Sequence, residues 1–134
     1  MTTTPLNSHT TVQQISREIM VTFDRVGFHC YPNAPEEVDY LATRHRHKFF
    51  FKVTVPVEHN ERDLEFHMFL TKITGWYDSS ALELNAKSCE TIAEQLALKI
   101  LGVYSKLHFC EVEVWEDQEC GARIRIENKT VSTL

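Results

Sequence analysis

Residues 45–57 alternate between two kinds of side chain more clearly than any other part of the chain. The odd-numbered residues begin with two histidines and continue with apolar side chains: His45, His47, Phe49, Phe51, Val53, Val55 and Val57. The even-numbered residues of this segment are mostly cationic or polar. Because side chains two apart in a strand share a face, this pattern predicts a strand whose histidines lie on the core-facing side. Pro56 falls near the strand's end, where a missing amide donor is tolerated.

Three other segments alternate in a similar way. The first runs from residue 19 to about His29, and a break in its phase at 24–25 predicts a bulge. The other two cover 110–114 and 122–126, with a turn at 117–118 between them. The sequence therefore predicts four strands in all.

Two segments instead carry apolar residues at helical spacing. The first begins at Asn60, an N-cap residue type that acids follow in the first turn, and extends to Trp76. The second begins after Ser88, another N-cap type, and extends to Leu101. Residues 77–87 read as a linker between them. The element order β-β-α-α-β-β predicts an α+β fold, a four-stranded antiparallel sheet with two helices on one face.

The length of 134 residues is that of one domain. Residues 1–15 are Thr-rich and lack apolar periodicity, so we expect a flexible N-terminal arm. The domain itself is expected to cover 16–128, followed by a C-terminal tail at 129–134.

Charge and hydropathy exclude several classes of partner. Fourteen Lys and Arg residues against 19 acids give a net charge of −5, which argues against a nucleic-acid surface. No apolar run approaches bilayer length, and the N-terminus lacks the regions of a secretory signal. We therefore expect a cytoplasmic protein that binds neither nucleic acid nor membrane. The four cysteines show no C-x-x-C spacing and are expected to be free thiols.

Three histidines form the candidate metal site. Catalytic zinc sites use three protein ligands and keep a fourth position open. His45 and His47 can supply two ligands from one face of a strand, and His29 can supply the third if the first two strands pair. The alternative is that the His-x-His pair only decorates the end of a strand.

The order of these motifs resembles the family of 6-pyruvoyl- and 6-carboxytetrahydropterin synthases, which have the tunnelling fold. The resemblance covers about residues 18–127. In that family a histidine that closes the first strand and a His-Gly-His triplet that opens the second bind Zn²⁺. These positions match His29, His45 and His47, and the resemblance implies that they hold zinc.

The resemblance also implies contacts with an organic ligand. The run at 112–117, Val-Glu-Val-Trp-Glu-Asp, is similar to the family segment whose glutamate accepts the amino-pyrimidinone edge of a pterin, and Glu116 matches that glutamate. Guanine carries the same edge. The openings of the two helices are similar at Glu65 and at Ser88, which become further ligand-binding candidates. The alternative for Glu116 is a solvated acid at a strand end.

The family's catalytic groups are only partly present. Its cysteine corresponds to Leu41, and its Asp-His pair corresponds to Asp78 and Ser79. Serine cannot relay protons near neutral pH as histidine does. Asp78 and an acid such as Glu37 are the remaining catalytic candidates, the latter as a base in place of the thiolate.

Two functional hypotheses follow. The first is a zinc-dependent lyase of the tetrahydropterin synthase type that acts on dihydroneopterin triphosphate. The second is a protein that binds a pterin or purine nucleotide without turning it over, which the missing catalytic groups favour. Family members form trimers and hexamers with the pocket between subunits, and the resemblance implies a homo-oligomer here.

Overall fold

A computed structural model describes residues 10–131 of the chain. Residues 1–9 and 132–134 lie outside the described part. Most of the predicted N-terminal arm and half of the predicted C-terminal tail therefore lie outside the described residues. None of the helices in the described part is both long and apolar enough to cross a bilayer.

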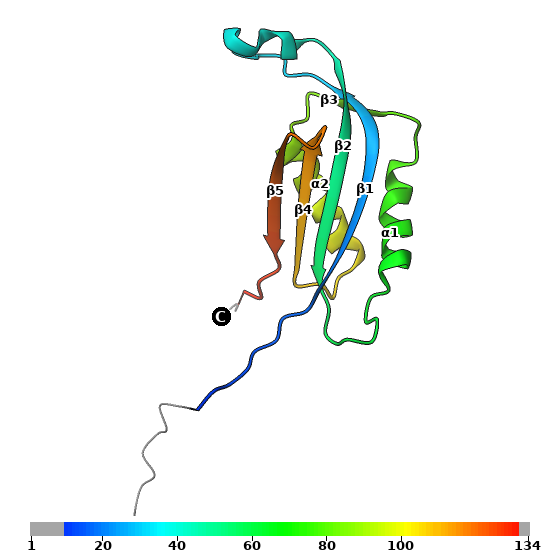
Figure 1. Ribbon diagram of the computed structural model, residues 1–134, viewed down its shortest axis with the longest axis vertical. Helices are drawn as coiled ribbons and strands as arrows, with labels where there is room; N and C mark the ends of the chain where they lie inside the picture. The colour runs from blue at the N-terminus through cyan, green and yellow to red at the C-terminus, as the bar shows by residue number, and fades with distance from the viewer. Residues whose placement is uncertain (1–9, 132–134) are drawn as a thin grey trace, which may run out of the picture.

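The described chain forms one five-stranded sheet in the order β3-β1-β2-β4-β5. The elements are β1 (Glu18–His29), η1 (Glu36–Ala42), β2 (His45–Pro56), α1 (Phe66–Thr74), η2 (Gly75–Tyr77), β3 (Leu82–Asn85), α2 (Cys89–Val103), β4 (Phe109–Glu116) and β5 (Cys120–Glu127). All neighbouring strands are antiparallel except β3, which is parallel to β1. Both α-helices pack on the same face of the sheet (Figure 1), which confirms the α+β class.

The fifth strand, β3, lies in the segment that was expected to be a linker. Leu82 and Leu84 are 8% and 6% exposed, whereas Glu83 and Asn85 between and after them face solvent. This alternation buries two leucines against β1, but it spans only four residues. The predicted count of four strands was therefore wrong by one short edge strand.

The core lies between the helices and the inner face of β2. Phe49, Phe51, Val53 and Val55 of that face are at most 1% exposed, and the alternation at 45–57 predicted this. Helix α2 covers β4 and β5, while α1 lies against β1. The predicted cap of α2 is confirmed, because the Ser88 hydroxyl accepts a hydrogen bond from the Thr91 amide at 3.1 Å.

Helix α1 begins five residues later than expected, as its cap is at 65 and not at 60. Its N-cap is Glu65, whose carboxylate accepts a hydrogen bond from the His67 amide at 2.6 Å. Asn60 does not cap a helix, because its side-chain oxygen accepts a hydrogen bond from Arg17. The Asp63 carboxylate accepts from the Glu58 amide at 2.8 Å and so stabilises a loop instead.

The bulge expected at 24–25 is absent. Strands β1 and β2 keep a continuous register from Glu18 to His29, so both histidines of the last pair, His29 and His45, face each other across it. The register shift occurs instead between Phe28 and His29, on the side where β1 pairs with β3.

A tight turn joins β4 to β5. Asp117 and Gln118 have φ of 52° and 61°, and the Glu119 amide donates to the Glu116 carbonyl at 2.9 Å. Left-handed conformation at both central residues is that of a type I′ turn, which matches the twist of a two-residue hairpin. This turn fixes the direction in which Glu116 and Asp117 leave the sheet.

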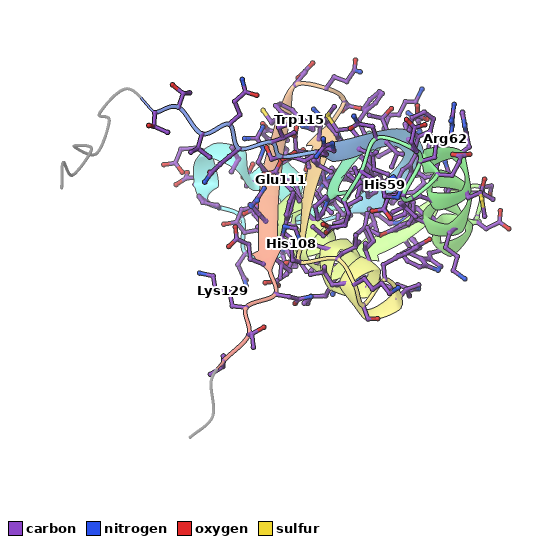
Figure 2. All side chains as sticks on the ribbon, turned by 90° about the horizontal axis from the view of Figure 1, so that it is seen from below. His59, Arg62, His108, Glu111, Trp115 and Lys129 are labelled. Carbon is purple, nitrogen blue, oxygen red and sulfur yellow. The ribbon has the colours of Figure 1, made fainter. Side chains whose placement is uncertain are left out.

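The outer face of the sheet is polar and aromatic. Figure 2 shows Glu111 and Trp115 of β4 on the side turned away from α2. The Trp115 indole donates to Glu113 at 2.9 Å, and Arg123 of β5 lies 3.2 Å from the same carboxylate. Among the described residues, no helix covers this face.

Candidate metal centre

Three histidines meet where β1 ends and β2 begins, at the top of the sheet in Figure 1. His45 is the register partner of His29, and His47 is the register partner of Gly27. The ring centroids are 4.6 Å apart for His29 and His45, 4.8 Å for His45 and His47, and 5.2 Å for His29 and His47. One nitrogen of each ring lies within 4.8 Å of those of the other two. The strand pairing thus gathers the three residues into one group, named the histidine triad below.

Each ring of the histidine triad has its Nδ1 atom committed to an acceptor. The acceptors are the Lys87 carbonyl for His29 (2.9 Å), the Thr43 carbonyl for His45 (2.8 Å) and the Asp117 carboxylate for His47 (2.6 Å). Carbonyl and carboxylate oxygens only accept, so each Nδ1 carries the hydrogen. In the neutral imidazole the Nε2 atom is then a bare lone pair. Acceptors of this kind orient metal-binding histidines and fix their tautomer.

Two of these lone pairs are buried without a partner. The Nε2 atoms of His29 and His47 make no hydrogen bond among the described residues, and His29 is only 7% exposed. An unpaired buried polar atom costs about 1–3 kcal/mol. A cation bound by all three nitrogens would remove that cost. Three neutral imidazoles with lone pairs that converge form the donor set that zinc prefers, so the residues fit the metal that the sequence implied.

Phe49 packs under the histidine triad. Its ring lies edge-on to His29 and His47, with centroid distances of 5.2 and 5.7 Å. The ring needs the space left by Gly27, because a Cβ there would lie 2.9 Å from Phe49 Cδ2 and 3.0 Å from Leu84 Cδ1. The apolar floor keeps water from the buried side of the site.

Glu116, at the end of β4, approaches the histidine triad. Its Oε1 atom lies 3.1 Å from His29 Nε2, and its Oε2 atom lies 3.4 Å from His47 Nε2. His29 holds the pKa of Glu116 below its ordinary value, and Glu116 raises the pKa of His29 against the opposing effect of burial. A charged carboxylate therefore stands beside the triad at neutral pH.

The thiol of Cys89, in the first turn of α2, adds a contact to this carboxylate. Its Sγ atom lies 3.7 Å from Glu116 Oε1. Burial, reinforced by the nearby Glu116 charge, raises the pKa of Cys89 to about 12, so the thiol keeps its proton and donates it. Cys89 is thus a hydrogen-bond donor rather than a nucleophile.

A cavity of about 510 Å³ opens beside His29, His45 and Glu116. Its other walls come from residues 30–31 after β1, from Leu41 of η1, from residues 86–90 at the start of α2, and from residues 120–121 of β5. This volume lies in the range of small-molecule sites. Leu41, the position that the resemblance matches to a cysteine, lines this space.

The structure brings together only some of the residues proposed from the sequence. His29, His45, Glu116 and Ser88 line the cavity, and His47 adjoins them as the third member of the histidine triad. The Ser88 hydroxyl is already engaged as the cap of α2. Glu65 caps α1 and lines a separate cavity of about 800 Å³. Glu37 on η1 and Asp78 after η2 are exposed, and neither lines the 510 Å³ cavity.

Sequence reasoning missed the groups that orient the rings. Two of the three are backbone carbonyls, at Thr43 and Lys87, which no residue type reveals. Asp117 carried a weak signal, because it adjoins Glu116 at a turn. Its two oxygens bind His47 Nδ1 at 2.6 Å and the Lys48 amide at 2.9 Å, and both bonds depend on the pairing of β2 with β4.

Comparison with solved structures identifies proteins that have a similar fold. A 6-pyruvoyl tetrahydropterin synthase from Plasmodium vivax superposes with a TM-score of 0.57 at 12% identity, over 85% of this chain and 99% of that one. The Plasmodium falciparum enzyme gives 0.56 at 15% identity, over 84% and 98%. The chain has the fold of the 6-pyruvoyl tetrahydropterin synthases. No family model matches the sequence, and no curated protein matches it.

Two further structures with this fold bear on catalysis. They are catalytic residue mutants of the P. vivax synthase in which a glutamate is replaced by cysteine or by alanine, each with a TM-score of 0.58 at 13% identity, over 85% of this chain and 99% of the mutant chain. In that enzyme, then, a glutamate is a catalytic residue.

Replacing Asp117 by asparagine is expected to weaken binding of a metal ion to the histidine triad by about tenfold to a hundredfold, the usual cost of losing an outer-shell partner. Asparagine tolerates left-handed φ as aspartate does, so the turn should survive. The measurement is competition with a chromophoric chelator. Glu119→Gln, in the same hairpin and outside the site, is the matched control. Equal metal affinity of Asp117→Asn and the unmodified protein would show that His47 needs no orienting carboxylate.

Proposed function

We propose that the protein is a zinc-binding protein of the synthase fold that holds a pterin or a purine nucleotide in the cavity beside the histidine triad, without turning it over. The observation that carries the proposal is the convergence of three imidazole lone pairs next to a charged carboxylate at the edge of a 510 Å³ cavity. Zinc would be held by His29, His45 and His47.

Glu116 is the group best suited to select the ligand. A carboxylate accepts two charge-assisted hydrogen bonds from adjacent N–H donors, and the amino-pyrimidinone edge of pterins and guanine presents such a pair. Its lowered pKa keeps the carboxylate ionised at neutral pH. The recognised class is therefore heterocycles with this edge.

The proposed lack of turnover is supported by two side chains that stand at the positions of catalytic groups in the family. Leu41 borders the cavity and offers no nucleophile or base. Ser79 replaces the imidazole partner of Asp78, and its hydroxyl donates to the Ala81 carbonyl at 3.0 Å. The Cys89 thiol, with a pKa of about 12, does not replace a thiolate. The two positions that match the family's cysteine and histidine, Leu41 and Ser79, thus carry no group that moves protons at carbon.

One observation favours an alternative function, a zinc-dependent lyase that acts on dihydroneopterin triphosphate. The Plasmodium vivax enzyme has a catalytic glutamate, and Glu37 lies on the same short helix as Leu41. Glu37 would have to turn toward the cavity to act as the base. Zinc in such an enzyme polarises oxygen atoms of the substrate.

Incubation of the zinc-loaded full chain with dihydroneopterin triphosphate separates the two functions. The expected result is retention of the compound in equilibrium dialysis, with no new product on chromatography compared with heat-treated protein. Glu116→Gln should weaken retention by about tenfold to a hundredfold, the effect of losing charge-assisted hydrogen bonds. Glu113→Gln, on the opposite face of β4, is the matched control.

Product formation would refute binding without turnover. If Glu37→Gln then removed the activity, the lyase would be the better description. If neither this compound nor guanosine triphosphate were retained, the pterin or purine class would be wrong.

Assembly into a homo-oligomer, a trimer or hexamer, is also part of the proposal. It is supported by the uncovered outer face of the sheet and by its two edge strands, β3 and β5. The cavity is bounded on one side by β5 residues Cys120 and Gly121, so a neighbour paired at this edge would close it. We also propose that the protein is located in the cytoplasm.

A further inference from the structure

Glu116 touches the histidine triad with both oxygens. Oε1 lies 3.1 Å from His29 Nε2, and Oε2 lies 3.4 Å from His47 Nε2. Binding of a heterocycle by this carboxylate does not by itself require that its oxygens face two ring nitrogens. The contact needs its own explanation.

These contacts are not hydrogen bonds between neutral rings and the carboxylate. The hydrogens of the neutral rings sit on Nδ1, where the acceptors are (Lys87 and Asp117). Within residues 10–131 these Nε2 atoms have no hydrogen-bond partner. Lone pairs on nitrogen and oxygen that face each other at this distance repel, unless a positive charge lies between them.

The spacing matches that of ligands around one ion. Tetrahedral zinc with bonds of about 2.0–2.2 Å to nitrogen and oxygen places neighbouring donor atoms about 3.4 Å apart. The separations of Glu116 from His29 and His47 are 3.1 and 3.4 Å, and the ligand nitrogens of the three histidines lie within 4.8 Å of one another. Building on the metal part of the proposed function, we propose that Glu116 is a fourth protein ligand, which makes the resting centre a closed site of three histidines and one glutamate.

The other explanation is an ion pair between Glu116 and a protonated His29. It would account for the contact at 3.1 Å. It leaves the His47 contact unexplained, because His47 Nε2 is equally buried and unpaired. One metal ion accounts for both contacts and for His45, whose Nδ1 atom is oriented in the same way.

Neighbouring groups hold the carboxylate in this position. The Cys89 thiol lies 3.7 Å from Oε1, and the turn at Asp117 and Gln118 ties the end of β4 to β5. A heterocycle that takes both oxygens of Glu116 must compete with the metal for them. Ligand binding would then free one coordination position at the metal.

Cobalt substitution tests the assignment on the metal alone. Zn²⁺ has no visible spectrum, whereas Co²⁺ reports its coordination through its absorption bands. The full chain is loaded with Co²⁺ and titrated with azide, a small anion that binds only where a position is open. The wild-type spectrum should be strongly absorbing, as for four-coordinate cobalt, and unchanged by azide. Glu116→Ala should bind cobalt more weakly and change its spectrum with azide.

Glu113→Gln, from the opposite face of β4, is the control and should behave as the wild type. An azide-induced change in the wild-type protein equal to that of Glu116→Ala would overturn the fourth-ligand assignment while leaving the metal site intact. Failure of the wild-type protein to bind cobalt at all would overturn the metal part of the proposed function as well. The wild-type titration decides the question even if Glu116→Ala does not fold, which circular dichroism would reveal.

Discussion

Replacing His45, a proposed zinc ligand, by alanine is expected to lower the affinity for zinc by more than about a hundredfold. Loss of an outer-shell partner costs about tenfold to a hundredfold, and loss of a direct ligand costs more. His45 is the best member of the histidine triad for this test, because it is half-exposed whereas His29 is buried. Its removal should therefore change metal binding with little effect on folding.

The measurement is zinc content after dialysis, together with competition against a chromophoric chelator. His67→Ala is the matched control, since His67 lies on α1 away from the site and its side chain is 80% exposed. The control should keep its zinc. Full zinc occupancy in His45→Ala would mean that the convergence of the three rings has another purpose.

Replacing Phe51 by alanine is expected to lower the free energy of unfolding by about 3–5 kcal/mol, the usual cost of removing a buried aromatic ring. Phe51 is 1% exposed at the centre of β2, and its ring stacks on Phe23 with a centroid distance of 4.5 Å. The cavity left behind would be enclosed by the sheet and the helices, so it cannot be filled by water at low cost.

Urea unfolding followed by circular dichroism measures this change, and a fall in melting temperature on the order of 10 °C should accompany it. Phe66→Ala removes the same atoms from a position that is 49% exposed and should cost little. Equal destabilisation by the two substitutions would contradict the placement of the core on the inner face of β2.

Strand parity explains why much of the fold could be predicted. The alternation at 45–57 placed His45 and His47 on the core side together with Phe49, and the structure has them there. The period of a strand is a local property, so one sequence suffices to read it. Ser88 as the cap of α2 is local in the same sense.

Long-range contacts explain the errors. Asn60 has the chemistry of a helix cap, yet Arg17, 43 positions earlier in the chain, engages its side chain. Strand β3 exists because Leu82 and Leu84 pack beside β1, a pairing that four residues of alternation cannot reveal. The acceptors of the three histidine rings come from residues 43, 87 and 117, and only the folded chain brings them together.

The left-handed turn between β4 and β5 sets a limit on attempts to make the protein more heat-resistant. Glycine adopts positive φ at the lowest cost, so Gln118→Gly relieves a conformation that side chains disfavour. The same change at Asp117 would relax the backbone too, but it would remove the carboxylate that orients His47. Changes that optimise this hairpin for stability alone would therefore remove the partner of His47 Nδ1 at position 117 but not at position 118.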